Sequence, residues 1–317
     1  MFGAITPDSN RTPIVYFHPR NCPSCAAESG ELEICSDPKA EQASWSDLQQ
    51  SWSGFFKSKL FFTYKRCTAC GLLYCPQYFD NNQLGELYGS MPDNTAGLGA
   101  ERTILTQSAY VRLLDKHSDD GDFLELGPDI GLFTVAYAKR FDTGSKRKYW
   151  LFEPNRRVHA ELAQRMGFCR HEIRTELFDL SAVPDNSVST TVMIHVLDHL
   201  LDPLAMLKEL KRKMKSGAMI YIVTHNERSF LARSLRKRWP AFCLQHPQLF
   251  NPKSIEGLLV NAGFRVCASR KTVNYFPASY LAQHALYLLG INLAFVGRIR
   301  SPMIGLRLGN MLTSAVV

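Results

Sequence analysis

The 317-residue sequence contains no long apolar run free of polar side chains, so it lacks a clear transmembrane helix. Residues 280–297 come nearest, but three polar side chains interrupt them, and we expect a helix packed on the protein. Peripheral membrane contact through residues 280–317 is the alternative, which Arg298 and Arg300 favour. The N-terminus has neither the basic start nor the apolar centre of a secretory leader, which predicts a cytoplasmic protein.

The sequence also lacks internal repeats, low-complexity segments and any acidic surplus. The net charge is +8 and the pI is about 9.0, which favours anionic partners. Proteins that bind single-stranded nucleic acid interleave basic and aromatic residues, and only residues 52–66 approach that pattern. We therefore expect a small anionic molecule as partner rather than nucleic acid. The composition predicts no oligomeric state.

Nine cysteines are present, and four of them form two pairs with C-x-x-C spacing. In a reducing compartment such pairs bind metal more often than they form disulfides. Two redox pairs are the alternative, but neither pair opens a helix in a thioredoxin-like unit. Four thiolates suit a closed, structural Zn²⁺ site without a vacant position for catalysis. The predicted zinc ligands are Cys22, Cys25, Cys67 and Cys70.

From about residue 102 onward, apolar patterns typical of helices and strands alternate along the chain. Such alternation predicts an α/β fold with a mostly parallel sheet that helices cover on both faces. Gly217 is expected to lie just past the end of its preceding helix. The expected helices are 102–117, 132–140, 156–166, 203–214 and the one that Pro252 opens, and the expected strands are 123–126, 149–152, 188–196, 219–224 and 264–269.

Two glycines, Gly127 and Gly131, follow the first expected strand and precede a helix. At that place in an α/β sheet, glycines let the backbone approach a ligand. Glu153, at the end of the next strand, is suited to accept hydrogen bonds from both hydroxyls of a ribose. The dinucleotide pattern G-x-G-x-x-G is absent, and Asp129 would repel a pyrophosphate, so we expect a nucleoside without phosphates. Structural roles, in which Glu125 caps the turn and Glu153 caps a helix, are the alternatives.

The segments that surround these residues resemble the class I S-adenosylmethionine-dependent methyltransferases. The resemblance implies a Rossmann-like, seven-stranded sheet with one antiparallel edge strand, and it covers most of residues 120–270. It also implies that the glycine turn holds the methionine part of S-adenosylmethionine, while acids after the second and third strands lie at the ribose and the adenine. The resembling segments are 125–131, 151–154, 178–180, 195–203 and 210–222. The implied cofactor-binding residues are Glu125, Gly127, Pro128, Gly131, Phe133, Glu153, Asp179, Leu180 and His195.

The second cysteine pair and the residues after it, 67–89, resemble the zinc-binding segment that precedes the methyltransferase domain in bacterial sugar and glycan methyltransferases. This resemblance implies O- or C-methylation of a sugar or of a nucleotide-linked or glycan intermediate. The domains are then expected to be a zinc-ribbon-like segment at 1–85, the methyltransferase domain at 86–272 and a C-terminal helical extension at 273–317.

Histidine suits the removal of a proton from an acceptor hydroxyl, because its pKa lies near neutrality. His195 follows the fourth strand and is our first candidate for the base, with a role in shaping the cofactor pocket as its alternative. His199 and His246 are further catalytic candidates, although His199 also suits a packing role. His225, after the fifth strand, is weighed with them. Asp198 either orients a histidine or caps the next helix.

The basic run 233–238 faces either an anionic substrate or solvent. Two departures from the methyltransferase pattern, Asp129 in the glycine turn and the segment 189–191 where an aspartate is usual, leave room for other functions. A second hypothesis is an RNA methyltransferase, although the chain lacks an Asn-Pro-Pro-Tyr-like motif after the fourth strand. A third is a non-catalytic scaffold that retains the fold.

Overall fold

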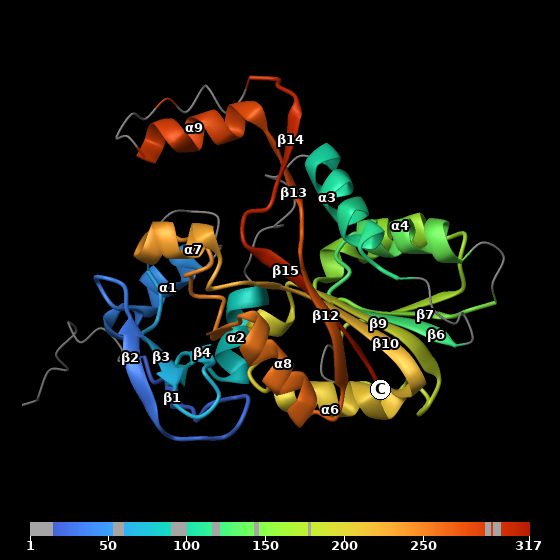
Figure 1. Cartoon of the computed structure of the whole chain (residues 1–317), viewed down its shortest axis with the longest axis horizontal. Helices are drawn as coiled ribbons and strands as arrows, with labels where there is room; N and C mark the ends of the chain where they lie inside the picture. The colour runs from blue at the N-terminus through green and yellow to red at the C-terminus, as the bar shows by residue number, and fades with distance from the viewer. Residues whose placement is uncertain are drawn as a thin grey trace, which may run out of the picture.

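The structure is a computed structural model that describes residues 15–52, 60–89, 100–115, 121–142, 146–176, 179–288, 293 and 299–317. A large α/β unit and a smaller cysteine-containing unit lie side by side (Figure 1). The N-terminal residues 1–14 and, within the stretch 280–297, residues 289–292 and 294–297 lie outside the described residues. No described helix is long and apolar enough to cross a membrane.

A seven-stranded sheet forms the centre of the large unit, as predicted. Its strand order is β12-β15-β10-β9-β6-β7-β8. The strands from β8 to β10 are parallel, and β15 runs antiparallel to both of its neighbours. The strands are β6 (Asp122–Leu126), β7 (Tyr149–Phe152), β8 (His171–Arg174), β9 (Val188–Ile194), β10 (Met214–His225), β12 (Arg265–Lys271) and β15 (Asn310–Val316).

Helices cover both faces of this sheet (Figure 1). Apolar side chains from one set of helices, such as Tyr137 and Leu162, pack on one face with sheet residues that include Tyr149. Side chains from the other set, such as Leu207 and Leu258, pack on the opposite face. The first set is α3 (Ala100–Arg112), α4 (Leu132–Phe141) and α5 (His159–Met166), which follows the short helix η2 (Arg156–Val158); the second is α6 (Pro203–Lys213) and α8 (Pro252–Asn261).

The last strand, β15, lies between β10 and β12, so the antiparallel strand is one position in from the edge. The resemblance implies an antiparallel edge strand, and the domain prediction places a helical extension at 273–317. That region instead holds one described helix, α9 (Ala278–Leu288), and the strand β15. It also holds an antiparallel pair of strands, β13 (Asn274–Pro277) and β14 (Met303–Leu306). The C-terminal residues therefore complete the central sheet.

Gly217 lies inside a strand, which corrects the prediction that it ends a helix. Helix α6 stops at Lys213 and β10 begins at Met214 without a loop. The pairing of β10 with β9 shifts register between Met214 and Met219, and Gly217 has φ of +77° within that shift. A left-handed backbone at a strand irregularity is a usual position for glycine.

The smaller unit is built on a four-stranded sheet of order β11-β4-β3-β2. Strand β11 lies between β10 and α8 in the sequence, so a segment of the large unit completes this sheet. Helix α2 crosses the expected boundary at residues 85 and 86. Its elements are β1 (His18–Pro19), β2 (Gly30–Ile34), η1 (Ala40–Gln42), α1 (Trp45–Ser51), β3 (Tyr64–Cys67), β4 (Leu73–Tyr74), β5 (Gln77–Tyr78), α2 (Asn81–Gly89) and β11 (Gln248–Leu249).

Candidate active site

The carboxyl ends of four parallel strands meet at one edge of the central sheet. Leu126 pairs with both Phe152 and Met193, and Ile194 pairs with Val223. The residues that follow these rows, which include the glycine turn, Glu153 and His195, therefore lie along the same edge. This is the edge at which open α/β sheets bind their ligands.

Three residues of the glycine turn have left-handed backbone conformations. The φ angles are +68° at Gly127, +53° at Asp129 and +78° at Gly131. A Cβ at Gly127 would come within 2.7 Å of Val196, and one at Gly131 within 2.6 Å of Leu162. The two glycines are therefore required by conformation and by space. Asp129 adopts the conformation that a glycine would favour, which aspartate tolerates better than most residues.

Glu153, directly after β7, is tied to the turn. Its carboxylate accepts one hydrogen bond from the Asp129 N–H and one from the Asn155 N–H, each at 2.8 Å. Only 6 % of Glu153 is exposed, and burial raises the pKa of its carboxyl group despite these bonds. The contacts fix the carboxylate beside the turn and leave lone pairs on both oxygens.

Glu125 lies beneath the turn rather than at its surface. It is 1 % exposed and accepts a hydrogen bond from the Thr134 hydroxyl in helix α4. Burial raises the pKa of Glu125 from 4.5 to about 8. In the structure, Glu125 connects the last residues of β6 to the first turn of α4, as expected of a structural acid.

The remaining predicted cofactor residues have different surroundings. Phe133 and Leu180 are buried in the two sheet-face cores. The Pro128 carbonyl accepts a hydrogen bond from the Gly131 N–H at 2.9 Å, which closes the turn. Asp179 is exposed, and its side chain accepts a hydrogen bond from the Ser181 N–H at 2.9 Å.

Four histidines form a cluster next to the sheet edge. The ring centroid of His225 lies 4.6 Å from that of His195 and 4.9 Å from that of His246, and the rings of His246 and His199 are 4.7 Å apart. The surroundings of His195, His199 and His225 disfavour the charged imidazolium, because burial lowers the pKa of each. The structure thus brings the three predicted catalytic histidines together, and His225 lies in the same cluster.

Asp198 orients a histidine and does not cap the following helix. Its carboxylate accepts hydrogen bonds from Nδ1 of His225 at 2.8 Å and from the His225 backbone N–H at 3.1 Å. The cap of α6 is Asp202, which accepts from the Ala205 N–H at 2.9 Å. The sequence alone did not indicate which histidine Asp198 would orient. The available signal was a histidine at the end of a buried strand.

His246 and His199 are each held through Nδ1. Nδ1 of His246 donates to the Ala241 carbonyl at 2.7 Å and lies 3.3 Å from Sγ of Cys243. Burial acts against a charge on His246, but Cys243 raises the pKa of its imidazole to about 9. Nδ1 of His199 lies 3.0 Å from the Tyr88 hydroxyl, so helix α2 of the smaller unit reaches the cluster.

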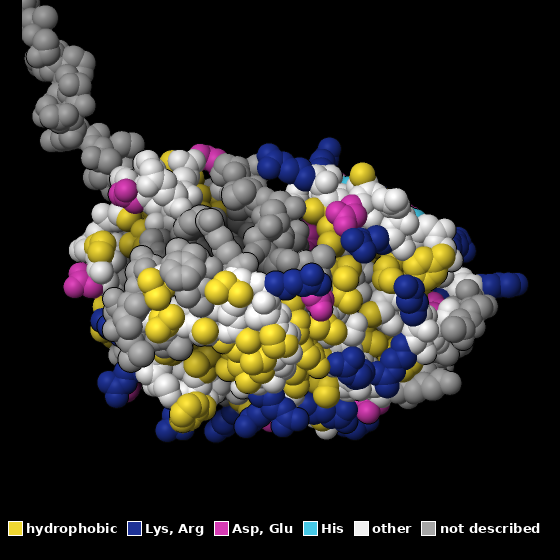
Figure 2. Space-filling view, turned by 90° about the horizontal axis from the view of Figure 1, so that it is seen from above, with side chains coloured by type: hydrophobic (Ala, Val, Ile, Leu, Met, Phe, Trp, Pro, Cys, Tyr) yellow, Lys and Arg dark blue, Asp and Glu magenta, His cyan; other side chains and the backbone are white. Residues whose placement is uncertain are grey.

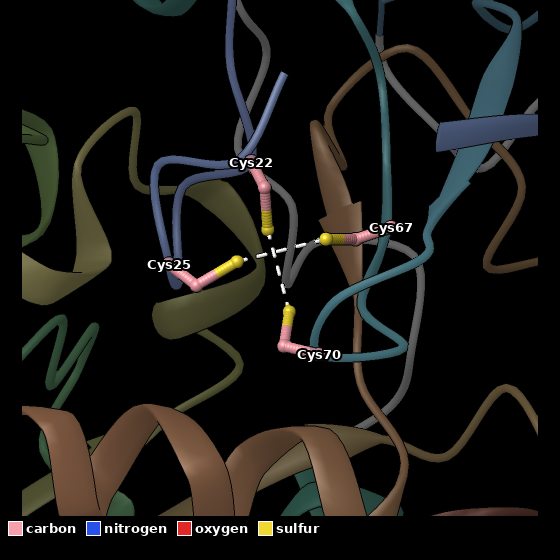
Figure 3. Close-up of side chains that lie close together, drawn as sticks. All are labelled: Cys22, Cys25, Cys67 and Cys70. Carbon is pink, nitrogen blue, oxygen red and sulfur yellow. Dashed lines mark hydrogen bonds between the residues drawn. The ribbon is translucent and has the colours of Figure 1, made fainter. Parts of the chain in front are cut away.

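The four paired cysteines converge from two turns of the smaller unit (Figure 3). The sulfur atoms of Cys22 and Cys70 are 3.4 Å apart, and those of Cys25 and Cys67 are 3.6 Å apart. All four sulfurs lie within 4.8 Å of one another, and none is in a disulfide. Sulfurs bound to one tetrahedral Zn²⁺ at about 2.3 Å would lie roughly 3.8 Å apart. The donor set and its spacing fit zinc.

A cavity of about 740 Å³ opens between the four-stranded sheet and the segment 227–242. Arg66 on its wall donates to Glu227 at 3.0 Å and also pairs with Glu33. Three further basic side chains line it without an ion pair among the residues that the structure describes. They are Arg233 of α7 (Phe230–Leu235) and Arg236 and Lys237 of η4 (Arg236–Arg238).

Trp239 separates this cavity from the histidine cluster. The ring of Phe242, which lines the cavity, lies 5.5 Å from that of Trp239, and Trp239 lies 6.1 Å from His225. Trp239 is 4 % exposed. The ring of Trp239 therefore lies between a residue that lines the basic cavity and a residue of the histidine cluster.

A family model described as a methyltransferase domain matches residues 101–269, more than half of the chain. The chain belongs to this family. Together with the seven-stranded sheet and its glycine turn, this makes the protein a class I S-adenosylmethionine-dependent methyltransferase. No curated protein matches the sequence.

Several solved structures are similar to the chain in fold. An S-adenosylmethionine-dependent methyltransferase from Thermotoga maritima, a possible histamine N-methyltransferase, has 18% identity and a TM-score of 0.44 over 68% of this chain and 89% of its own. One from Aquifex aeolicus has 17% identity and a TM-score of 0.42, over 75% of this chain and 100% of its own. A family 2 O-methyltransferase from Planctomyces limnophilus, in complex with apigenin, has 13% identity and a TM-score of 0.48, over 69% and 59%.

Proposed function

We propose that this enzyme methylates a small anionic acceptor, a sugar or a nucleotide-linked or glycan intermediate, at oxygen or carbon. The observation that carries the proposal is the histidine cluster at the carboxyl ends of β9 and β10, beside the glycine turn. The imidazoles of His195, His199 and His225, whose pKa values burial lowers, are suited to accept a proton from an acceptor hydroxyl. Methyl transfer then depends largely on alignment of the two reactants.

The cofactor is proposed to bind along the glycine turn and Glu153. When bound, it supplies the activated methyl group. Gly127 and Gly131 allow close backbone approach, and Glu153 is oriented by two backbone N–H groups for hydrogen bonds to a ribose. The other proposed contributors are Glu125, Pro128, Phe133, Asp179, Leu180 and His195; of these, Phe133 and Leu180 shape the site from the core.

His195, His199 and His246 are proposed as the catalytic residues on the acceptor side. His195 follows β9 directly. The next residue in the chain, Val196, packs against Gly127 of the glycine turn. The side chains of His199 and His246 are fixed by Tyr88 and by the Ala241 carbonyl. Fixed imidazoles lose little conformational freedom when an acceptor binds, which favours a defined geometry.

The basic cavity supports an anionic acceptor. Arg233, Arg236 and Lys237 supply positive charge in the cavity, which the Trp239 side chain separates from His225. A phosphate or diphosphate in the cavity would leave the attached sugar to reach toward Trp239 and His225. Charge-assisted hydrogen bonds of this kind are stronger than neutral ones.

A structural Zn²⁺ is proposed at Cys22, Cys25, Cys67 and Cys70. The site lies at the interface with the methyltransferase unit, because these cysteines pack in the same hydrophobic core as Leu258 of α8. The ion would hold the two cysteine turns together and thereby position β3 and β4, which border the basic cavity. Four thiolates leave no open coordination position, so the role is structural.

Residues 1–85 and 86–272 are proposed as the two main domains, with α2 shared across their boundary. We also propose that the region 280–317 makes peripheral contact with an anionic membrane through its residues that precede the buried strand β15. In Figure 2, apolar side chains gather on the face that bears α9, with lysine and arginine beside them. Ile299 and Ile304 are 55% and 39% exposed in this region, and Arg300 is exposed as well. Sedimentation with vesicles containing phosphatidylserine, against neutral vesicles, tests the contact.

The central experiment measures cofactor binding and product formation with the full-length protein. Calorimetry with S-adenosylhomocysteine should show one site, and Glu153→Gln should weaken it at least about tenfold, because a neutral amide accepts fewer hydrogen bonds from ribose hydroxyls. The matched control is Glu172→Gln on the edge strand β8, which should bind normally. Mass spectrometry of products from a panel of nucleotide sugars, with phosphate-free sugars beside them, identifies the acceptor. A folded protein that binds no cofactor would contradict the proposal.

A further inference from the structure

Three potential metal ligands converge within the histidine cluster from three different segments. His195 directly follows β9, Asp198 lies in the short helix η3 (Leu197–His199), and His225 is the last residue of β10. One nitrogen or oxygen atom of each lies within 4.8 Å of those of the other two. The group is separate from the four cysteines, which form another such cluster.

Asp198 has an unsatisfied oxygen in this group. Its side chain is fully buried, at 0 % exposure, and one oxygen accepts both hydrogen bonds from His225. The other oxygen, Oδ1, has no hydrogen-bond partner within the part of the chain that the structure describes. Buried carboxylates are normally paired with cations or fully hydrogen-bonded. An unpartnered Oδ1 therefore indicates that a cation or a hydrogen-bond donor belongs beside it.

His195 shows a second unsatisfied atom and a strained backbone. Its Nδ1 is buried and also has no partner among the described residues. Its φ is +54°, a conformation that non-glycine residues adopt rarely and that concentrates at functional sites. The Nε2 atom lies 3.2 Å from the amide nitrogen Nδ2 of Asn310. The oxygen and nitrogen of an Asn side chain exchange places when its amide is rotated by half a turn; in that arrangement Nε2–H donates to the amide oxygen and Nδ1 keeps a free lone pair.

We propose that His195, Asp198 and His225 bind a divalent transition-metal ion. Two imidazoles and one carboxylate suit Zn²⁺, Fe²⁺, Co²⁺ or Mn²⁺ better than Mg²⁺ or Ca²⁺, which favour oxygen ligands. Three protein ligands leave open positions, in contrast to the four thiolates. The His225 side chain is 23% exposed, which gives the site contact with solvent.

A proton shared between Asp198 and His225 is the simpler occupant of this place. Nδ1 of His225 and Oδ2 of Asp198 are 2.8 Å apart, which suits either a hydrogen bond or two ligands of one ion. The proton satisfies only these two atoms, however. An ion in its place would also provide a partner for Nδ1 of His195, and the carboxylate would be charge-compensated. The ion therefore accounts for more of the group than the proton does.

The role of the ion rests on the proposed function, whereas its binding does not. An ion held by these residues would lie at the sheet edge beside the glycine turn, where the acceptor is proposed to bind, and its open coordination positions would be available to an acceptor hydroxyl. An acceptor hydroxyl bound there would lose its proton more readily, because the ion stabilises the alkoxide oxygen. The proton would pass to water. His195 would then act through the ion rather than as a free base.

Cobalt binding to the full-length protein tests this site. The purified protein is stripped with a chelator, and Co²⁺ is titrated while absorption and total bound metal are recorded. The cysteine site gives sulfur-to-cobalt charge-transfer bands, which a site of nitrogen and oxygen ligands lacks. The wild type should bind two ions per chain. Asp198→Asn and His195→Gln should each weaken Co²⁺ binding at least about 50-fold at the site that lacks sulfur-to-cobalt bands. The control His171→Gln on β8 should retain both ions.

Folding of each variant is checked by its thermal transition and by circular dichroism. A wild type that takes up only the ion with thiolate bands would overturn the site, as would retention of the second ion in both folded variants. Two bound ions with no cofactor binding would keep the site and refute the proposed function. Full turnover of the chelated protein on an identified acceptor would keep the function and refute the catalytic role of the ion.

Discussion

The backbone N–H of Asp129 donates a hydrogen bond of 2.8 Å to the carboxylate of Glu153. This bond joins the glycine turn after β6 to the end of the neighbouring strand β7. Asp129 had looked like a departure from the methyltransferase pattern, because a glycine is usual at its place. In the structure its φ of +53° lies in the left-handed region that glycine adopts without steric cost, and its N–H donates to the residue proposed to hold the ribose.

The conformational role of Asp129 predicts how substitutions there rank. Asp129→Gly should change the free energy of unfolding by less than about 1 kcal/mol, since glycine adopts the same backbone with no steric cost. Asp129→Val should lose about 1–2 kcal/mol, because a β-branched residue is strained with positive φ. Denaturant unfolding and calorimetry with S-adenosylhomocysteine measure both effects. Equal behaviour of the two variants would show that backbone conformation at this position is unimportant.

Glu125 predicts a pH dependence of stability. Its pKa is raised by burial from 4.5 to about 8, so the folded protein retains a proton that the unfolded chain releases near pH 4.5. The stabilisation is complete below pH 4.5 and is lost as the pH rises through about 8. The contribution to the slope is at most about 1.4 kcal/mol per pH unit. Denaturant unfolding of the apoprotein between pH 5 and 8 should therefore show stability falling with pH.

Glu125→Gln removes this titration and should flatten the pH dependence over that range. The matched control is Glu161→Gln on the exposed face of α5, which should leave the slope unchanged. If the slope of the wild type survives in Glu125→Gln, another group is responsible for it.

The alternation of strands and helices was readable from the sequence because each element carries its own apolar pattern. The segment 149–152 is buried at every residue, and the structure has β7 over the same four residues. The cysteine cluster was also predictable, since both C-x-x-C turns are short and local. Such features need no knowledge of which segments meet in space.

The features that were missed depend on contacts between distant segments. Strand β15 holds Asn310, Thr313 and Ser314 among its residues, and it becomes a buried strand only through pairing with β10 and β12. Asp198 and His225 are 27 residues apart and meet because β9 and β10 end side by side. A residue pattern alone does not reveal such a meeting.

The cysteine cluster predicts dependence of folding on zinc. Cys25→Ser and Cys70→Ser should each lose the ion and unfold the smaller unit, because the free energy of structural zinc binding is on the order of 10 kcal/mol in small peptides and is also folding energy. Emission spectroscopy for zinc and circular dichroism measure both outcomes. Cys35→Ser, at a free cysteine outside the cluster, should bind zinc and fold normally. Normal folding of the cluster variants without zinc would refute a structural role.

The basic cavity predicts a contrast between two neighbouring side chains of the run RSLRKR. Lys237 lines the cavity, whereas Arg238 is exposed in the same short helix and does not line it. Lys237→Ala should raise KM for a phosphorylated acceptor about tenfold, since hydrogen bonds to charged groups contribute roughly 1.5–3 kcal/mol. Arg238→Ala should change KM by less than twofold. The loss at Lys237 should shrink as salt is added, because exposed charges are screened. Equal losses for both variants would instead indicate general attraction by the positive charge of the protein, with no phosphate bound in the cavity.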